Sequence, residues 1–129
     1  MSYYQGNDLR KPTGGLKKRH RGKRKYELGS PPANTLLSDK EERVIVRVRG
    51  GNKEVVLKRA LYINVAVHNE GVAKKVKVID VVETPSNPQN ARFKIITKGT
   101  IVKTELGFAR ITSRPGQDGV LNGVLIEKK

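Results

Sequence analysis

Residues 43–60 read RVIVRVRGGNKEVVLKRA, and this stretch predicts the fold class. Val44, Val46 and Val48 alternate along the chain, and Arg43, Arg47 and Arg49 fall on the opposite face of a β-strand, whose side chains point alternately to its two faces. The Gly-Gly-Asn at 50–52 supplies the positive φ angles that a tight hairpin turn requires. With a return strand over 54–59, the stretch predicts a β-hairpin.

The same alternation continues toward the C-terminus. It predicts further strands over residues 61–68, 76–82, 93–97, 100–103, 106–112 and 120–126. With the hairpin this gives roughly six to eight short strands about ten residues apart, without a long helix. One helical turn is also expected at 38–42. A barrel is favoured over a sandwich because an open sheet of this size would leave aggregation-prone edges. We therefore predict an all-β fold, a small antiparallel barrel of about six strands.

The N-terminal part of the chain has a different composition. Residues 1–30 hold nine Lys and Arg, only two carboxylates, five glycines and few aliphatic side chains. Such a segment cannot bury enough apolar surface to offset its loss of conformational entropy. Prolines 31 and 32 then favour a stiff polyproline linker. We predict a long basic N-terminal tail with its linker at 1–35, disordered alone and extended on a bound partner, and a β-barrel body at 36–129.

Charge indicates the class of partner. The 129 residues include 27 Lys and Arg against 12 Asp and Glu, a formal net charge of +15. This excess is unfavourable through self-repulsion, so a protein that carries it usually has a polyanionic partner. Nucleic acid is the first candidate. An anionic membrane surface is a weaker one, since no apolar run approaches the roughly 20 residues of a membrane-spanning helix.

The residues offer no constellation for catalysis. The chain has no cysteine and two histidines, so disulfides and the usual Cys and His zinc site are excluded. Neither His20 nor His68 has a recognisable serine or carboxylate partner motif. The glycine-rich loop at 113–119 lacks the Gly-Lys-Ser/Thr ending of a phosphate-binding loop, and we predict a tight turn ending in a β-bulge there. We expect no enzyme activity, cofactor, metal or small-molecule substrate.

Basic residues are the candidate binding residues. Eight cations lie within 11–25, where they can neutralise phosphates and release counterions. Arginine adds bidentate phosphate contacts and stacking on bases. A solvated charge run or a nuclear localisation signal is the alternative, which the density of cations and glycines disfavours. The predicted RNA-binding residues are Arg10, Lys11, Thr13, Gly14, Gly15, Lys17, Lys18, Arg19, His20, Arg21, Lys23, Arg24, Lys25, Tyr26, Arg47, Arg49, Lys53, Arg92, Lys98, Arg110 and Arg114.

Several motifs in order resemble a known family. A basic residue before Thr-Gly-Gly at 10–15, the basic run and the Lys-Tyr-Glu-Leu-Gly ending at 25–29 look like the S-eight-e family of small-subunit ribosomal proteins. The likeness continues through 31–35, 47–52, 87–92, 95–99 and 112–119, and so covers essentially the whole chain. Eukaryotic members carry an insertion in the second half, so the chain resembles the archaeal form.

The resemblance implies a function as well as a fold. It implies a six-stranded barrel with an N-terminal extension laid along small-subunit ribosomal RNA, and no catalysis. The implied partners are this RNA and neighbouring ribosomal proteins in the cytoplasm, with no membrane and no homo-oligomer. A ribosome assembly factor or another transient nucleic-acid-binding protein is the alternative, and an RNA-modifying enzyme is a third. We expect a structural constituent of the small ribosomal subunit.

Overall fold

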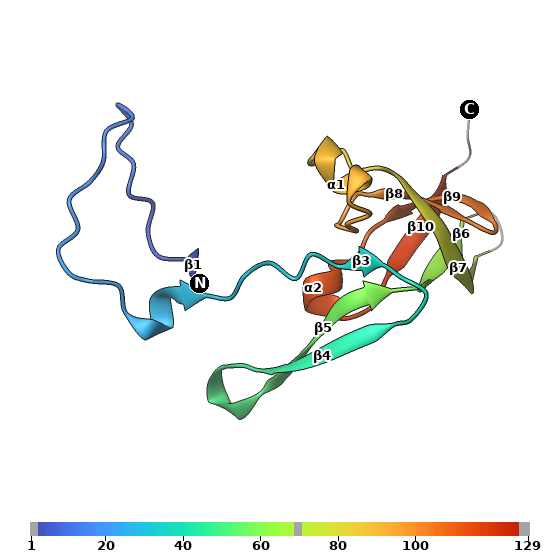
Figure 1. The fold of residues 1–129 in the computed structure, drawn as a ribbon, viewed down its shortest axis with the longest axis horizontal. Helices are drawn as coiled ribbons and strands as arrows, with labels where there is room; N and C mark the ends of the chain where they lie inside the picture. The colour runs from blue at the N-terminus through green and yellow to red at the C-terminus, as the bar shows by residue number, and fades with distance from the viewer. Residues whose placement is uncertain (1–2, 69–70, 127–129) are drawn as a thin grey trace. The chain divides into compact units, whose positions relative to one another are not determined.

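The N-terminal unit of the protein turns back on itself. The computed structural model describes residues 3–68 and 71–126, and the chain divides into two compact units, Met1–Pro32 and Ala33–Lys129 (Figure 1). In the first unit, β1 (Tyr3–Tyr4) pairs antiparallel with β2 (Leu28–Gly29). A single 3-10 turn, η1 (Lys25–Glu27), leads into β2. The predicted extended course of this segment is therefore not confirmed, since its two ends are joined by the β1–β2 pair.

A closed barrel of five strands forms the centre of the second unit. The strands follow the order β10-β6-β7-β8-β9, and β9 pairs with β10 to close the ring. Their bounds are β6 (Tyr62–Val67), β7 (Val72–Glu83), β8 (Ile101–Thr104), β9 (Gly107–Ile111) and β10 (Asn122–Ile126). The strand-rich class and the barrel are as predicted. The count of about six strands is not confirmed, and β6 and β10 are parallel, not antiparallel.

A three-stranded sheet accompanies the barrel. Its order is β3-β5-β4, with β3 (Leu36–Leu37), β4 (Glu42–Arg47) and β5 (Lys53–Ala60). Strands β4 and β5 form the predicted hairpin, and Arg47 lies opposite Lys53. They are joined through η2 (Arg49–Gly51), where both glycines have φ of 77°. Every residue of β4 is exposed, so the alternating valines do not mark a buried face.

One apolar core joins this sheet to the barrel. Leu57 and Ala60 of β5 are fully buried with Ile63 and Val65 of β6, in a cluster that also includes residues of β7, β8 and β9. Burial of each Leu, Ile or Val side chain in this cluster stabilises the fold by about 1.5–3 kcal/mol. Thr35 belongs to the same unit: it is buried, and its Oγ1 donates to the carbonyl of Leu57 at 2.6 Å.

The loops of the body contain two short helices, and three local predictions differ from the structure. α1 (Pro88–Arg92) begins after Asn87, whose side chain accepts the N–H of Gln89. The strand predicted at 93–97 is wrong, because only Ile95 makes an isolated bridge there. The turn predicted at 113–119 is instead the helix α2 (Pro115–Asp118). No helical turn forms at 38–42. None of the helices in the described ranges is long and apolar enough to cross a membrane.

Candidate nucleic-acid interface

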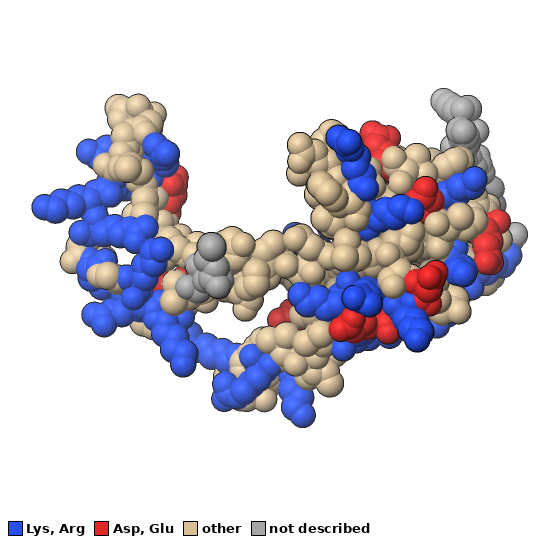
Figure 2. Space-filling view, viewed as in Figure 1, with Lys and Arg blue, Asp and Glu red and all other residues tan. Residues whose placement is uncertain are grey.

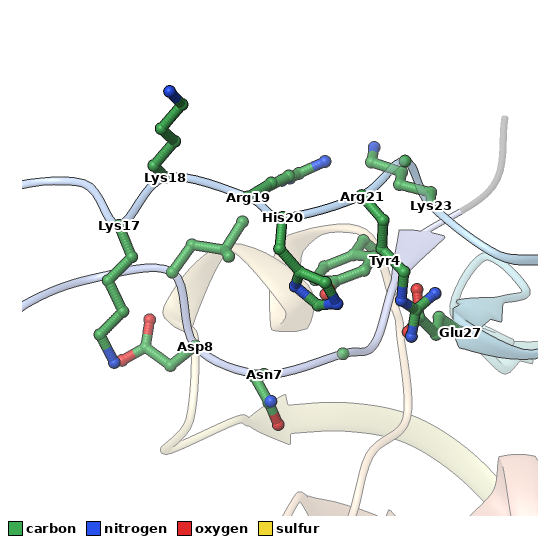
Figure 3. Close-up of a pocket in the computed structure, with 13 residues that line it drawn as sticks. Tyr4, Asn7, Asp8, Lys17, Lys18, Arg19, His20, Arg21, Lys23 and Glu27 are labelled. Carbon is green, nitrogen blue, oxygen red and sulfur yellow. The ribbon is translucent and has the colours of Figure 1, made fainter.

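The basic run lies on a loop that is closed at its base. Beside the β1–β2 pair, the N–H of Gln5 donates to the carbonyl of Glu27 at 2.8 Å. Further out, the N–H of Lys17 donates to the carbonyl of Leu9 at 2.7 Å. The segment before the turn of this loop and the basic segment after it therefore run side by side, as Figure 3 shows for Asn7 and the residues opposite it. We call these two segments the limbs of the extension.

The Thr-Gly-Gly motif reverses the chain between the limbs. The N–H of Gly14 donates to the carbonyl of Lys11 at 2.9 Å, and the N–H of Lys11 donates to the carbonyl of Gly15 at 2.8 Å. Gly14 has φ of 85°, a conformation that favours glycine. Arg10 supports the turn by donating from Nη1 to the Gly14 carbonyl at 3.0 Å. Part of the motif predicted to contact RNA thus shapes the loop.

A pocket of about 300 Å³ lies between the limbs. Five cations line it against two carboxylates, and the lining side chains include Tyr4, Asp8, Lys17, Lys18, Arg19, His20, Arg21, Lys23 and Glu27 (Figure 3). Both carboxylates already accept protein hydrogen bonds: Asp8 from the N–H of Arg10 at 2.9 Å, and Glu27 from two donors described next. The pocket therefore keeps a strong excess of positive charge, which suits it to an anion.

Glu27 is the internal anchor of the loop. Its Oε1 accepts from Nη2 of Arg21 at 2.6 Å, and its Oε2 accepts the N–H of Arg24 at 3.1 Å. In Figure 3 the Arg21 side chain runs toward Glu27. The hydrogen bond from Arg24 holds the pKa of Glu27 below its ordinary value, and the charge of Arg21 lowers it further. Burial would lower the pKa of Arg21, but the charge of the Glu27 carboxylate, together with interactions with Tyr26, outweighs it, so that this pKa is raised.

Tyr4 gathers two cations on one aromatic ring. The guanidinium carbon of Arg19 lies 5.0 Å from the ring centroid, and Nζ of Lys23 lies 5.8 Å from it. Both distances are within the range of cation–π attraction. Tyr4 was not among the residues predicted to bind RNA. No sequence motif links Tyr4 to the basic run, because only the pairing of β1 with β2 brings the two together.

The residues predicted to contact RNA lie almost entirely at the surface. Arg21 is half-buried, and all the others are exposed. Figure 2 shows Lys and Arg covering much of the extension, and also present at the tip of the β4–β5 hairpin. Arg47, Arg49 and Lys53 come together at that tip, since Arg47 and Lys53 are register partners and Arg49 lies in η2 between the strands.

The remaining predicted residues of the body are spread over several elements. Arg92 ends α1, Lys98 lies before β8, Arg110 lies on β9 and Arg114 precedes α2. These four residues do not share one element, whereas Arg47, Arg49 and Lys53 all lie at the hairpin tip. Arg43 of β4, which is not one of the predicted RNA-binding residues, makes polar contacts within the protein. Its Nε donates to the carbonyl of Gly119 at 3.0 Å, and its Nη1 pairs with Glu41 at 3.0 Å.

Metal binding finds no support in the described part of the chain. Within residues 3–68 and 71–126, no group of three or more His, Cys, Asp or Glu side chains is placed to hold a metal ion. The chemistry available at the extension and the hairpin tip is that of exposed ammonium and guanidinium groups.

Known proteins match this chain over nearly its full length. The family model of ribosomal protein S8e matches residues 4–126. The small ribosomal subunit protein eS8 of Staphylothermus marinus is 68% identical, over 99% of this chain and 100% of the relative. Those of Ignicoccus hospitalis and Hyperthermus butylicus are 59% and 57% identical over 100% of this chain, covering 100% and 96% of the relatives. The chain therefore belongs to the ribosomal protein S8e family.

Proposed function

We propose that this protein is a structural constituent of the small ribosomal subunit, of the archaeal form, and that it binds ribosomal RNA through its basic extension and the cationic surface of its body. Relatives named as small ribosomal subunit proteins match it end to end, which supports the ribosomal role. The observation that carries RNA binding is the basic run, displayed on an exposed loop around a pocket with excess positive charge. The protein then works in the cytoplasm with ribosomal RNA and neighbouring ribosomal proteins as partners, and we assign it no catalysis or cofactor.

The extension is suited to ordering on RNA. Its two limbs are joined by a ladder of only two residue pairs, together with a few further hydrogen bonds. An isolated two-stranded ribbon is marginally stable in water. The crowded cations also repel one another until phosphates neutralise them. RNA therefore supplies the free energy that holds the loop in one conformation, and the tip formed by Arg47, Arg49 and Lys53 gives the body a second point of attachment.

The first test places the protein in the cell. A native extract is sedimented through a sucrose gradient, and the protein is followed by mass spectrometry across the fractions. Near-stoichiometric presence in mature small subunits and in translating ribosomes is expected. Presence only in precursor particles, or at the top of the gradient, would instead identify an assembly factor or a transient nucleic-acid-binding protein.

The second test addresses the extension. Replacing Lys17, Lys18, Arg19 and Arg21 with alanine is expected to weaken binding to archaeal small-subunit ribosomal RNA. Each lost phosphate contact flattens the dependence of log K on log salt by about 0.7–0.9. The matched control replaces four exposed lysines outside the predicted interface, Lys40, Lys75, Lys77 and Lys103. An equal loss in the control would show that only net charge matters, and would contradict binding through the extension.

A further inference from the structure

We infer that the pocket between the limbs holds one phosphodiester group of the RNA backbone, and that Arg21 and Glu27 position this pocket without contacting the RNA. The inference rests on the proposed function and deepens it by dividing the basic run into ligand-binding and positioning residues. Two residues of the same type fall in different groups: Arg19 is a ligand-binding residue and Arg21 is a positioning residue.

Arg21 is already committed inside the loop. Its side chain is 32% exposed and that of Glu27 is 18% exposed, so the pair is partly shielded from solvent. Nη2 is paired with Glu27, and Nη1 is buried and makes no hydrogen bond to any described residue. The guanidinium also lies 5.7 Å from the centroid of the Tyr26 ring. A cation whose charge is already met by a carboxylate neutralises no phosphate, and so it displaces none of the counterions condensed on the RNA.

The other cations of the pocket are available. Lys17, Lys18, Arg19 and Lys23 are exposed, and none of them forms an ion pair with a carboxylate in residues 3–68 and 71–126. Lys18 is one of the lining residues, and in Figure 3 its side chain points away from the opposite limb. Arg19 and Lys23 are the two that the Tyr4 ring holds together.

The Tyr4 ring explains why a phosphate fits there. Two cations within 6 Å of one ring repel each other, and no carboxylate of the pocket is paired with either of them. A phosphodiester removes that repulsion, since its anionic oxygens accept from a guanidinium and an ammonium group at once. The backbone of RNA presents this group once per nucleotide whatever the base, which agrees with a site built from charge and not from base-reading side chains.

Replacing Glu27 separates the inference from simple electrostatic attraction, because the two predict opposite changes in RNA affinity. Glu27→Gln adds one net positive charge beside the RNA, and simple attraction would then tighten binding. If Glu27 positions Arg21 and the N–H of Arg24, its loss instead opens the base of the loop. Binding then weakens, because a smaller fraction of the protein holds the pocket in its binding conformation.

The experiment measures the affinity of the full chain for archaeal small-subunit ribosomal RNA over a range of KCl concentrations. Arg19→Gln is expected to lower the salt slope by about 0.7–0.9. Arg21→Gln and Glu27→Gln are each expected to weaken binding by about threefold or more with the wild-type slope retained. The control is Glu105→Gln, which removes an exposed carboxylate in the turn between β8 and β9 and is expected to leave binding unchanged or tighter.

Two results overturn the inference while leaving the proposed function standing. One is a fall in slope for Arg21→Gln equal to that for Arg19→Gln, since Arg21 would then contact a phosphate itself. The other is binding by Glu27→Gln that is as tight as wild type or tighter, as for Glu105→Gln. A wild-type chain that shows no salt-dependent binding to this RNA would refute the proposed function itself, so the two failures are distinguishable.

Discussion

Substituting Gly119 tests the close approach of α2 to β5 in the body. Gly119 ends α2 with φ of 70° and ψ of 6°, and it is buried. A Cβ at this position would lie 2.9 Å from the carbonyl oxygen of Val55 in β5 and 3.0 Å from its Cγ1, whereas ordinary contact begins at 3.4 Å. Gly119→Ala therefore carries two separate penalties, one from the backbone conformation and one from the contact with β5.

The two penalties have different sizes. A left-handed conformation costs a residue with a Cβ about 1–2 kcal/mol. Relieving the contact moves the β5 backbone by roughly half an ångström, and overpacking of this kind costs about 1–3 kcal/mol. Gly119→Ala is therefore expected to lower the free energy of unfolding by about 2–5 kcal/mol. Gly99→Ala is the matched control, since Gly99 has φ of 88° but no atom within 4 Å of its would-be Cβ. It carries the backbone penalty alone, about 1–2 kcal/mol.

Equilibrium unfolding in guanidinium chloride, followed by circular dichroism, measures both variants against wild type. The expected order of stability is wild type, then Gly99→Ala, then Gly119→Ala. Equal losses for the two variants would refute the close approach of α2 to β5, because β5 would then accommodate the new methyl group without strain. If both variants were as stable as wild type, the expected cost of a positive φ for alanine would be refuted as well.

The remaining predictions concern one buried hydroxyl and one carboxylate. Thr35→Val is expected to lower the free energy of unfolding by about 1–3 kcal/mol, because the carbonyl of Leu57 loses its buried donor. Thr112→Val, at an exposed position, is expected to change it by about 0.5 kcal/mol at most in the same unfolding assay. Since the pKa of Glu27 is lowered in the loop, its contribution to loop stability is complete above the ordinary value of about 4.3 and is lost as pH falls through the lowered pKa. Carboxyl NMR titration should show that lowered pKa in wild type and a higher one in Arg21→Gln, and an unchanged pKa in the variant would exclude the ion pair as a cause.

Most of the strands could be predicted from the sequence because alternation reports side-chain direction directly. The strand predicted at 93–97 shows where this fails. Its apolar pattern suggested that Phe93 and Ile95 share a buried face, yet Phe93 is 66% exposed and Ile96 is the buried residue. Lys94 has φ of 55°, which is incompatible with a strand. Nothing in a lysine side chain signals a left-handed conformation, so the break could not be seen in the sequence.

The candidate interface was predictable in composition but not in shape. The density of Lys and Arg identified the extension, because charge is a local property of the sequence. The closed loop depends instead on Tyr3 opposite Gly29 and on Arg21 beside Glu27. Such pairings have no periodic signal, and the low apolar content argued for an extended chain. The composition therefore indicated a uniform basic tail, whereas the structure distinguishes Arg21 from its neighbours.

The position of β10 has a consequence for how the chain is made. This last strand lies between β6 and β9, parallel to one and antiparallel to the other. A chain that stops before Asn122 thus lacks the closure of the barrel, and is left with two unpaired strand edges of the kind that aggregates. Synthesis from the N-terminus completes the extension first and the barrel last. The segment proposed to bind RNA is therefore synthesised before the barrel can close. A nonsense codon shortly before Asn122 would remove β10, and with it the barrel closure, but would leave that segment in the chain.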